Sequence, residues 1–177
     1  MNIYTPLNFG TARLPLILQG LGVGMEHNST LDYVVNLHKK NTDALGFIPY
    51  PTVEKLILND QICMTNEGGL NASFCLFGSG KGSSLKIYQH CVEQDLRMLD
   101  HGKRLFSIVS DKAREKGYDN IQLRCRENLE ANKFWKALGF KKFYFEKKIT
   151  KRTNKGINHW CFEIKSPQQY FFNWGGH

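Results

Sequence analysis

The chain has 177 residues, the usual length of one domain, of which 41% are hydrophobic and 23% charged. This composition is typical of a folded globular protein and excludes a disordered chain. The formal net charge is +8, and it is unevenly placed: residues 1–77 carry a net −2 and residues 78–177 a net +10. Such an excess predicts an acidic partner, which could be phosphate, nucleic acid or a membrane surface.

The cysteines indicate a reduced protein. Their number is odd and no pair has Cys-x-x-Cys spacing, which argues against a disulfide framework and against a zinc site, so no metal is expected. Each lies in an apolar or strand-like run, and we expect buried thiols at Cys63, Cys75, Cys91, Cys125 and Cys161. A reducing cytoplasm is the expected compartment. No run of about 18 apolar residues is present, so no membrane span is expected.

The first part of the chain predicts an arm, two helices and three strands. Residues 1–28 are apolar but broken by Pro and Gly, which suggests an irregular N-terminal arm or a first strand. A helix is expected to begin at Ser29 or Thr30 and to end at Gly46. The elements expected next are a short helix over 53–57 and strands over 61–65, 72–77 and 85–92.

The second part predicts two helices with strands between and after them. The expected elements are a helix over 102–116, a strand over 120–126, a helix capped by Asn128 and ended by Gly139, and strands over 140–149 and 157–164. A basic turn over 150–156 joins the last two strands, and the apolar tail 166–177 is expected to dock on the core or on a second subunit. This order predicts one α+β domain with a mixed sheet.

The most specific motif is the segment Asn-Leu-Glu-Ala-Asn-Lys-Phe-Trp-Lys-Ala-Leu-Gly-Phe, residues 128–140, which follows a strand and opens a helix. It resembles the late segment Asn-x-x-Ala-x-x-Phe-Tyr-x-x-x-Gly-Phe of the GNAT N-acetyltransferase superfamily. Every position matches except one, because Trp135 stands where tyrosine is usual. The resemblance covers roughly residues 30–165. It implies a mixed, mostly antiparallel sheet flanked by helices, whose third and fourth strands splay apart to admit acetyl-coenzyme A.

A second motif lies where a strand runs through a loop into the helix that starts near Gly102. The free N–H groups of a helix start suit a pyrophosphate, and glycine lets phosphate approach the backbone closely. Lys103 and Arg104 place positive charge at this helix start, which is unusual unless an anion binds there. The GNAT pyrophosphate motif is similar, Arg/Gln-x-x-Gly-x-Gly/Ala. Arg97 and Gly102 match its ends, whereas Asp100 replaces its middle glycine.

The resemblance implies acetyl-coenzyme A as acyl donor and a set of residues that hold it. Its pantetheine arm would pair with the backbone of residues 91–93, and its pyrophosphate would lie on the loop 97–102. The implied cofactor-binding residues are Cys91, Val92, Arg97, His101, Gly102, Lys103, Arg104, Asn128, Phe134 and Trp135.

The implied reaction is direct transfer of an acetyl group to a primary amine of a small molecule or a peptide. The amine must lose a proton, and the candidate bases are His90 and Glu93. The family's acid is the tyrosine that Trp135 replaces, and an indole N–H does not titrate. Either Tyr88 or Tyr144 serves instead, or the thiolate leaves without an acid. Covalent catalysis by Cys91 or Cys125 is disfavoured by their expected burial.

Two other functions stay open. One is a GNAT fold that binds without catalysis, which Trp135 and Asp100 suggest. The other is a protein directed at nucleic acid, because residues 141–155 carry a net +6 with Phe143, Tyr144 and Phe145 interleaved. The interpretation favoured for this segment is a strand whose aromatic side chains face the core and whose lysines face water. A homodimer is also compatible with the sequence.

Overall fold

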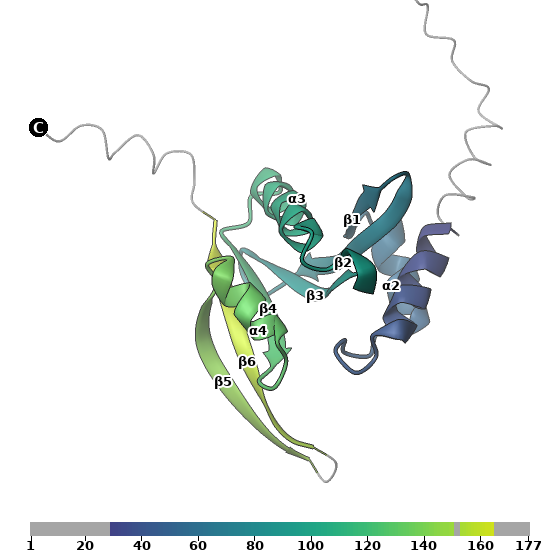
Figure 1. Ribbon diagram of the computed structural model, residues 1–177. Coiled ribbons are helices and arrows are strands. Elements are labelled where there is room, and N and C mark those ends of the chain that lie inside the picture. The colour runs from purple at the N-terminus through teal and green to yellow at the C-terminus, as the bar shows by residue number, and fades with distance from the viewer. Residues whose placement is uncertain (1–28, 151–152, 165–177) are drawn as a thin grey trace, which may run out of the picture.

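The computed structural model describes residues 29–150 and 153–164, and the expected N-terminal arm and C-terminal tail lie outside them. A six-stranded sheet of order β1-β2-β3-β4-β6-β5 runs through the molecule (Figure 1). After a first helix over residues 29–40, the elements are α2 (Tyr50–Leu58), β1 (Ile62–Glu67), β2 (Leu70–Ser79), β3 (Ser84–Val92), α3 (His101–Glu115), β4 (Asn120–Arg126), α4 (Ala131–Ala137), β5 (Lys141–Thr150) and β6 (Thr153–Glu163). All strand pairs are antiparallel except β3 with β4, which confirms the predicted α+β fold with a mixed sheet.

The sheet has a hydrophobic core on each face. Residues 72–78 of β2 are buried without alternation, because helices pack on both sides of this strand. α3 and α4 cover one face, where Leu105, Phe106 and Trp135 join side chains of five strands. The first helix and α2 cover the other, where Val34 and Leu56 pack with residues of β1, β2 and β3.

The central strands separate early. β3 and β4 pair through only three positions, from Ser84 opposite Asn120 to Lys86 opposite Gln122. Beyond that point β3 continues to Val92 and β4 to Arg126 without pairing with each other. The predicted splay is thereby confirmed. A bulge at Tyr88 follows directly, since Ile87 and Gln89 pair with adjacent residues of β2.

Three local predictions are wrong in detail. The predicted helix to Gly46 stops at residue 40, and turns follow. Asn128 is not the N-cap of α4: it is exposed in the preceding turn, and Glu130 occupies the cap position. The predicted basic turn over 150–156 is mostly strand, because cross-strand pairing continues to Thr150 opposite Thr153.

The cysteines agree with the prediction of buried free thiols. All five thiols are free, and all are buried except Cys161, which is partly exposed. In the two described stretches of the chain, every helix is too short or too polar to cross a membrane.

Gly156 of β6 lies under the ring of Phe145, and an added Cβ would overlap the atoms of that ring. We therefore expect Gly156→Ala to lower the free energy of unfolding by about 1–3 kcal/mol, measured by urea denaturation. Gly46→Ala is the control and should stay within about 0.5 kcal/mol, since its Cβ meets nothing within 4 Å. If adding Phe145→Ala to Gly156→Ala recovers none of the loss, the clash is not its cause.

Candidate functional site

Buried polar atoms without a hydrogen-bond partner gather around the splayed part of β3. Among the described residues they are Tyr33 Oη, Gln89 Oε1 and His90 Nε2. Gln89 and His90 follow the last pairing of β3 with β4, and Tyr33 lies in the first helix. Burial, with smaller contributions from Glu93 and Cys91, raises the pKa of Tyr33. Because buried polar groups are nearly always paired, this concentration makes the splayed part of β3 the candidate ligand site.

His90 occupies the face of β3 that is turned toward α3 and α4. Its ring lies 5.4 Å from that of Phe134 and 5.2 Å from that of Trp135, centroid to centroid. Burial lowers the pKa of His90 to about 4, so the imidazole is neutral at pH 7. A neutral imidazole of this pKa is a weak proton acceptor for an amine.

Gln89 occupies the opposite face of the same strand and is only 3% exposed. Its amide nitrogen donates to the carbonyl oxygen of Gly46 at 2.6 Å and to Nδ1 of His38 at 3.0 Å. The carbonyl can only accept, which fixes the orientation of the amide and leaves Oε1 as the unpaired atom. Gln89 was not predicted as a site residue, because the bulge at Tyr88 shifts the alternation of β3 and no sequence signal marks that bulge.

Glu93 follows β3 on the side of the first helix. Its carboxylate lies 3.5 Å from the ammonium of Lys40, and its charge contributes to the raised pKa of Tyr33. The contact with Lys40 places the Glu93 carboxylate on the side of the first helix, which is also the side of Gln89. The candidate bases Glu93 and His90 therefore lie on opposite faces of β3.

The loop before α3 has an unusual backbone. Met98 and Asp100 both have left-handed φ angles, 65° and 60°. The helix begins at His101, so its first free N–H groups follow this loop directly. The carboxylate of Asp100 pairs with Lys103 at 2.8 Å, and that hydrogen bond lowers the pKa of Asp100. Asp100 thus adopts the backbone conformation that favours glycine, the residue of the GNAT motif at this position.

Other predicted residues of this region face elsewhere. Arg97 donates to Asn41 Oδ1 at 2.6 Å and to the carbonyl of Val92 at 3.3 Å, which links the end of β3 to the end of the first helix. His101 is 1% exposed, and its ring lies 3.4 Å from Thr65 Oγ1. The imidazole of His101 therefore points into the protein, and only its backbone can face the loop.

Arg104 also turns toward the strands. It pairs with Glu67 at 3.3 Å and lies against the ring of His101. Lys103, by contrast, is exposed beside Asp100. Of the two cations predicted at the helix start, Lys103 is thus the one beside the loop.

The start of α4 contacts the start of α3. A Cβ added to Gly102 would lie 3.2 Å from the ring of Phe134, so these two predicted residues are adjacent. Trp135 is buried against His90, Phe134 and Phe140, which makes it a core residue. Asn128 is exposed in the turn before α4.

The side chain of Asn132 forms several hydrogen bonds between α4, the end of β4 and β6. Its Nδ2 donates to the carbonyls of Arg126 at 2.7 Å and Leu129 at 2.8 Å. Its Oδ1 accepts from Asn158 Nδ2 and from Trp160 Nε1, both at 3.0 Å. The sequence analysis did not single it out, since it occupies a position that the GNAT motif leaves variable.

The remaining candidate catalytic residues lie in different parts of the sheet. Tyr88 forms the bulge where the splay begins, and its ring lies against Gly78. Tyr144 is on β5, which β6 and β4 separate from β3, so it is not part of this site. Cys91 and Cys125 are buried, and burial raises the pKa of each thiol to about 11, which disfavours a thiolate nucleophile.

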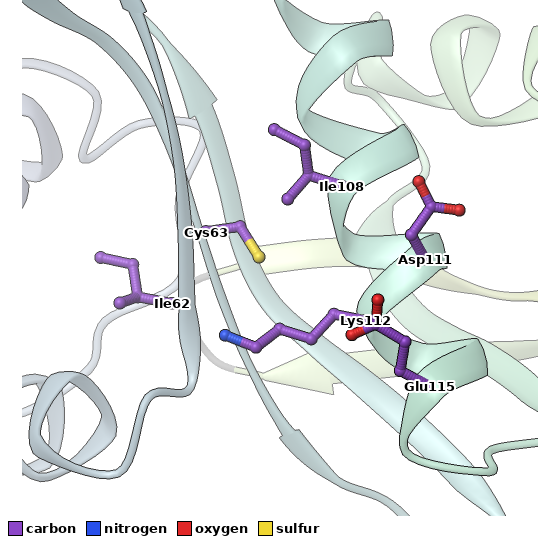
Figure 2. Close-up of a pocket in the computed structure, with 6 residues that line it drawn as sticks. All are labelled: Ile62, Cys63, Ile108, Asp111, Lys112 and Glu115. Atoms are coloured by element: carbon purple, nitrogen blue, oxygen red, sulfur yellow. The ribbon is translucent and has the colours of Figure 1, made fainter. Parts of the chain in front are cut away.

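A separate pocket lies between β1 and α3 and includes none of the predicted site residues (Figure 2). Lys112 at this pocket is paired with Asp60 at 2.7 Å. The pocket has no unpaired buried polar atom of the kind found along β3. Its lining consists of Ile62, Cys63, Ile108, Asp111, Lys112 and Glu115.

Known proteins match this chain in their three-dimensional structure and not in their sequence. No family model and no curated protein matches the sequence. The ribosomal-protein-S18-alanine N-acetyltransferase of Escherichia coli is similar at a TM-score of 0.64 and 15% identity, over 78% of this chain and 90% of that one. Ard1 of Thermoplasma volcanium is similar at 0.66 and 16%, over 77% and 92%.

An aminoglycoside 6'-N-acetyltransferase in complex with coenzyme A is similar at a TM-score of 0.65 and 14% identity, over 77% of this chain and 91% of that one. These likenesses agree with the sheet order and with the splayed pair of strands. The chain therefore has the fold of the GNAT acetyltransferases.

Proposed function

We propose that the protein transfers an acyl group from acetyl-coenzyme A to a primary amine. The observation that carries this proposal is the set of unpaired buried polar atoms on both faces of β3, at the splay where GNAT proteins admit the donor. The loop before α3 supplies backbone N–H groups suited to a pyrophosphate, and Lys103 adds positive charge beside them. Acetyl-coenzyme A would supply the thioester whose acyl group is transferred.

The two faces of β3 suggest a division of roles. Residues of the α3 face would hold the donor: the loop 97–102 and Gly102 its pyrophosphate, and His90 and Phe134 the arm beside them. The backbone of Cys91 and Val92 would line the open edge of β3. On the other face, Gln89 Oε1 would accept an N–H of the acceptor and orient its lone pair.

Proton transfer then falls to groups around the splay. The amine nitrogen bonds to the acyl carbon, the bond from that carbon to sulfur breaks, and the amine loses one proton. Glu93 is the proposed acceptor of that proton, since it lies on the same face of β3 as Gln89, whereas His90 lies on the face toward α3 and α4. The hydroxyl of Tyr88 lies beside Gly78 of β2, so Tyr88 would have to turn toward the gap between β3 and β4 to donate a proton to the leaving thiolate; otherwise the thiolate would leave without a protein acid.

Binding and turnover test this proposal separately. We expect calorimetric titration to show one acetyl-coenzyme A site of micromolar Kd, and a thiol reagent to detect coenzyme A release with an amine panel. Absence of binding at high micromolar ligand would overturn the function. Binding without thiol release would instead support the second candidate, a binding module, which the buried Trp135 in place of tyrosine favours.

Asp100→Gly should strengthen acetyl-coenzyme A binding by about fivefold to tenfold. The change relieves a left-handed backbone, removes a negative charge and frees Lys103 from its ion pair. Met98→Gly is the matched control, because it relieves the same kind of backbone without altering charge. Equal gains from both variants would assign the effect to the backbone alone, and weaker binding by Asp100→Gly would contradict a phosphate site on this loop.

A further inference from the structure

The end of β4 faces β3 across the splay and carries two arginines on the side away from α3 and α4. Arg124 and Arg126 alternate with Leu123 and Cys125, which are buried under those two helices. On the other face of the sheet, the first helix and α2 pack on residues of β1, β2 and β3 (Figure 1). Gln89 also lies on that face, as its bond to Gly46 shows, so polar groups from both sides of the splay share one face of the sheet.

The same face is bordered by exposed rings of β5. Phe143 is 57% and Tyr144 55% exposed, and both rings meet His159 of β6 edge-on. Phe145, on the other side of the strand, is also exposed. The prediction that these aromatic side chains face the core is therefore wrong, because β5 is an edge strand with a register shift before Tyr144.

Arg126 has no partner for its charge among the described residues. It is partly buried, yet its guanidinium forms no ion pair and no hydrogen bond within 29–150 or 153–164. Glu146 lies in the same row of the sheet, since both residues pair with Ile157, but its carboxylate binds Arg124 at 2.5 Å and His159 at 3.2 Å. Because burial of a charge costs free energy unless the charge is paired, Arg126 is suited to an anionic group of a ligand.

The opposite charge lies across the splay at a similar height. The last paired positions of the two strands are Lys86 and Gln122. Arg126 is four residues beyond this pair and Gln89 three, roughly 13 and 10 Å along their strands. Glu93 follows at the end of β3, on the same side as Gln89. A ligand in the gap would therefore have an amide oxygen and a carboxylate on one side and a guanidinium on the other.

We propose that the acceptor is an amine that also carries a carboxylate, as an amino acid does, and that Arg126 binds this carboxylate. This inference rests on the proposed acyl transfer and adds the class of its acceptor. The amine would lie at Gln89 and Glu93, while the guanidinium holds both carboxylate oxygens and so orients the molecule. A phosphate dianion fits less well, because the carboxylates of Glu93 and Glu146 lie on the same face.

Matched acceptors test this inference with the full chain and acetyl-coenzyme A. Glycine, β-alanine, γ-aminobutyrate and ε-aminocaproate are compared with n-alkylamines of equal length, and a thiol reagent detects the release of coenzyme A. We expect at least one amino acid to exceed its matched alkylamine about tenfold or more in kcat/KM. The phosphonate analogue of γ-aminobutyrate should be a poorer acceptor than γ-aminobutyrate itself.

Variants of Arg126 assign the preference to this residue. Arg126→Gln should lower kcat/KM for the preferred amino acid about tenfold to a hundredfold, mainly through KM, and should leave the matched alkylamine within about twofold. Arg126→Lys keeps the charge without the two-point contact and should give an intermediate loss. Arg114→Gln is the matched control, an exposed arginine of α3 on the opposite face of the sheet, and should change neither acceptor.

A binding measurement completes the test without turnover. Calorimetric titration of the coenzyme A-loaded protein with the preferred amino acid should show a site that Arg126→Gln weakens, while the Kd of acetyl-coenzyme A stays unchanged in every variant. A loss of acetyl-coenzyme A binding in both Arg126→Gln and Arg126→Lys would assign Arg126 to the donor or to the fold and would overturn the inference.

The outcomes distinguish this inference from the transfer itself. Equal use of amino acids and alkylamines, a preference for the phosphonate, or a preference for amino acids that Arg126→Gln leaves intact would overturn the inference and keep the transfer. Acetyl-coenzyme A binding without thiol release from any amine would remove the transfer, and this class of acceptor with it.

Discussion

Replacing Asn132 by alanine should lower the free energy of unfolding by about 3–5 kcal/mol. The change removes the acceptor of two buried donors, Trp160 Nε1 and Asn158 Nδ2. Both residues are buried in the sheet, so each donor would lose its partner without gaining water. The carbonyls of Arg126, at the end of β4, and of Leu129, in the turn before α4, lose a donor in the same step.

Urea unfolding followed by circular dichroism measures this loss, and tryptophan fluorescence reports the surroundings of Trp160. Asn128→Ala is the matched control, an exposed asparagine at the head of the same motif, and should change stability by less than about 0.5 kcal/mol. Asn132→Asp keeps an acceptor for both donors but loses the donor to the carbonyls, so its loss should be intermediate. A small effect of Asn132→Ala would mean that the network is not what holds α4 to β6.

The hydrogen bonds of Asn132 also position α4 beside the splay. Asn132 joins the end of β4, the first turn of α4 and β6. α4 carries Phe134 and Trp135 against His90, and Phe134 also covers Gly102. Asn132 is therefore a positioning residue in this arrangement, because it fixes the helix that holds the rings at the splay.

The helices and strands could be predicted from the sequence where a single periodic pattern or a terminating glycine dominates. The alternation of β4, the apolar stripe of α3 and the terminating Gly117 and Gly139, whose φ angles are positive, placed those elements within a residue or two. The motif at residues 128–140 led to the family resemblance, and the splay that the resemblance implied is present. Local sequence signals of this kind are strong because they depend on few long-range contacts.

The sequence-based predictions fail where tertiary contacts determine the position or the exposure of a residue. In the sequence, Gln89 resembles any polar strand residue. The bulge at Tyr88 turns its side chain toward the interior, where its amide donates a hydrogen bond to the carbonyl of Gly46. The exposed rings of β5 follow from its place at the sheet edge and from a register shift, which the sequence does not encode locally. Asn128 has the residue type that is preferred at a helix N-cap, yet it is the side chain of Asn132 that forms hydrogen bonds with the backbone before α4.

Under the proposed transfer, the two reactants would meet from the two faces of β3. His90 and the start of α3 lie on one face, and Gln89 and Glu93 on the other. An amine on the Gln89 face would reach a thioester in the gap between β3 and β4 without crossing the paired part of the sheet. Donor and acceptor on separate faces would be compatible with the proposed direct transfer.

The buried imidazole of His90 should make the protein less stable in mild acid. Its folded pKa, about 4, is below the ordinary value of 6.5, so the unfolded chain binds more protons between these two values. Stability is then complete above about pH 6.5, falls as the pH drops toward 4, and loses no more from this group below that. The shift corresponds to about 3 kcal/mol over the window.

Urea midpoints measured from pH 4 to pH 8 test this, with His90→Gln and His90→Phe compared with the parent chain. Carboxylates also contribute to acid sensitivity, and the difference between parent and variant removes that shared part. We expect both variants to be less sensitive than the parent between pH 6.5 and 4. The two variants should share the same flatter profile, and His90→Phe should be the more stable of the two at neutral pH, because it places a ring against Phe134 and Trp135 and leaves no buried polar atom unpaired. If the parent and both variants lose stability in parallel, the unpaired Nε2 of His90 does not remain neutral by burial, and its assignment to the donor side of the splay loses its physical basis.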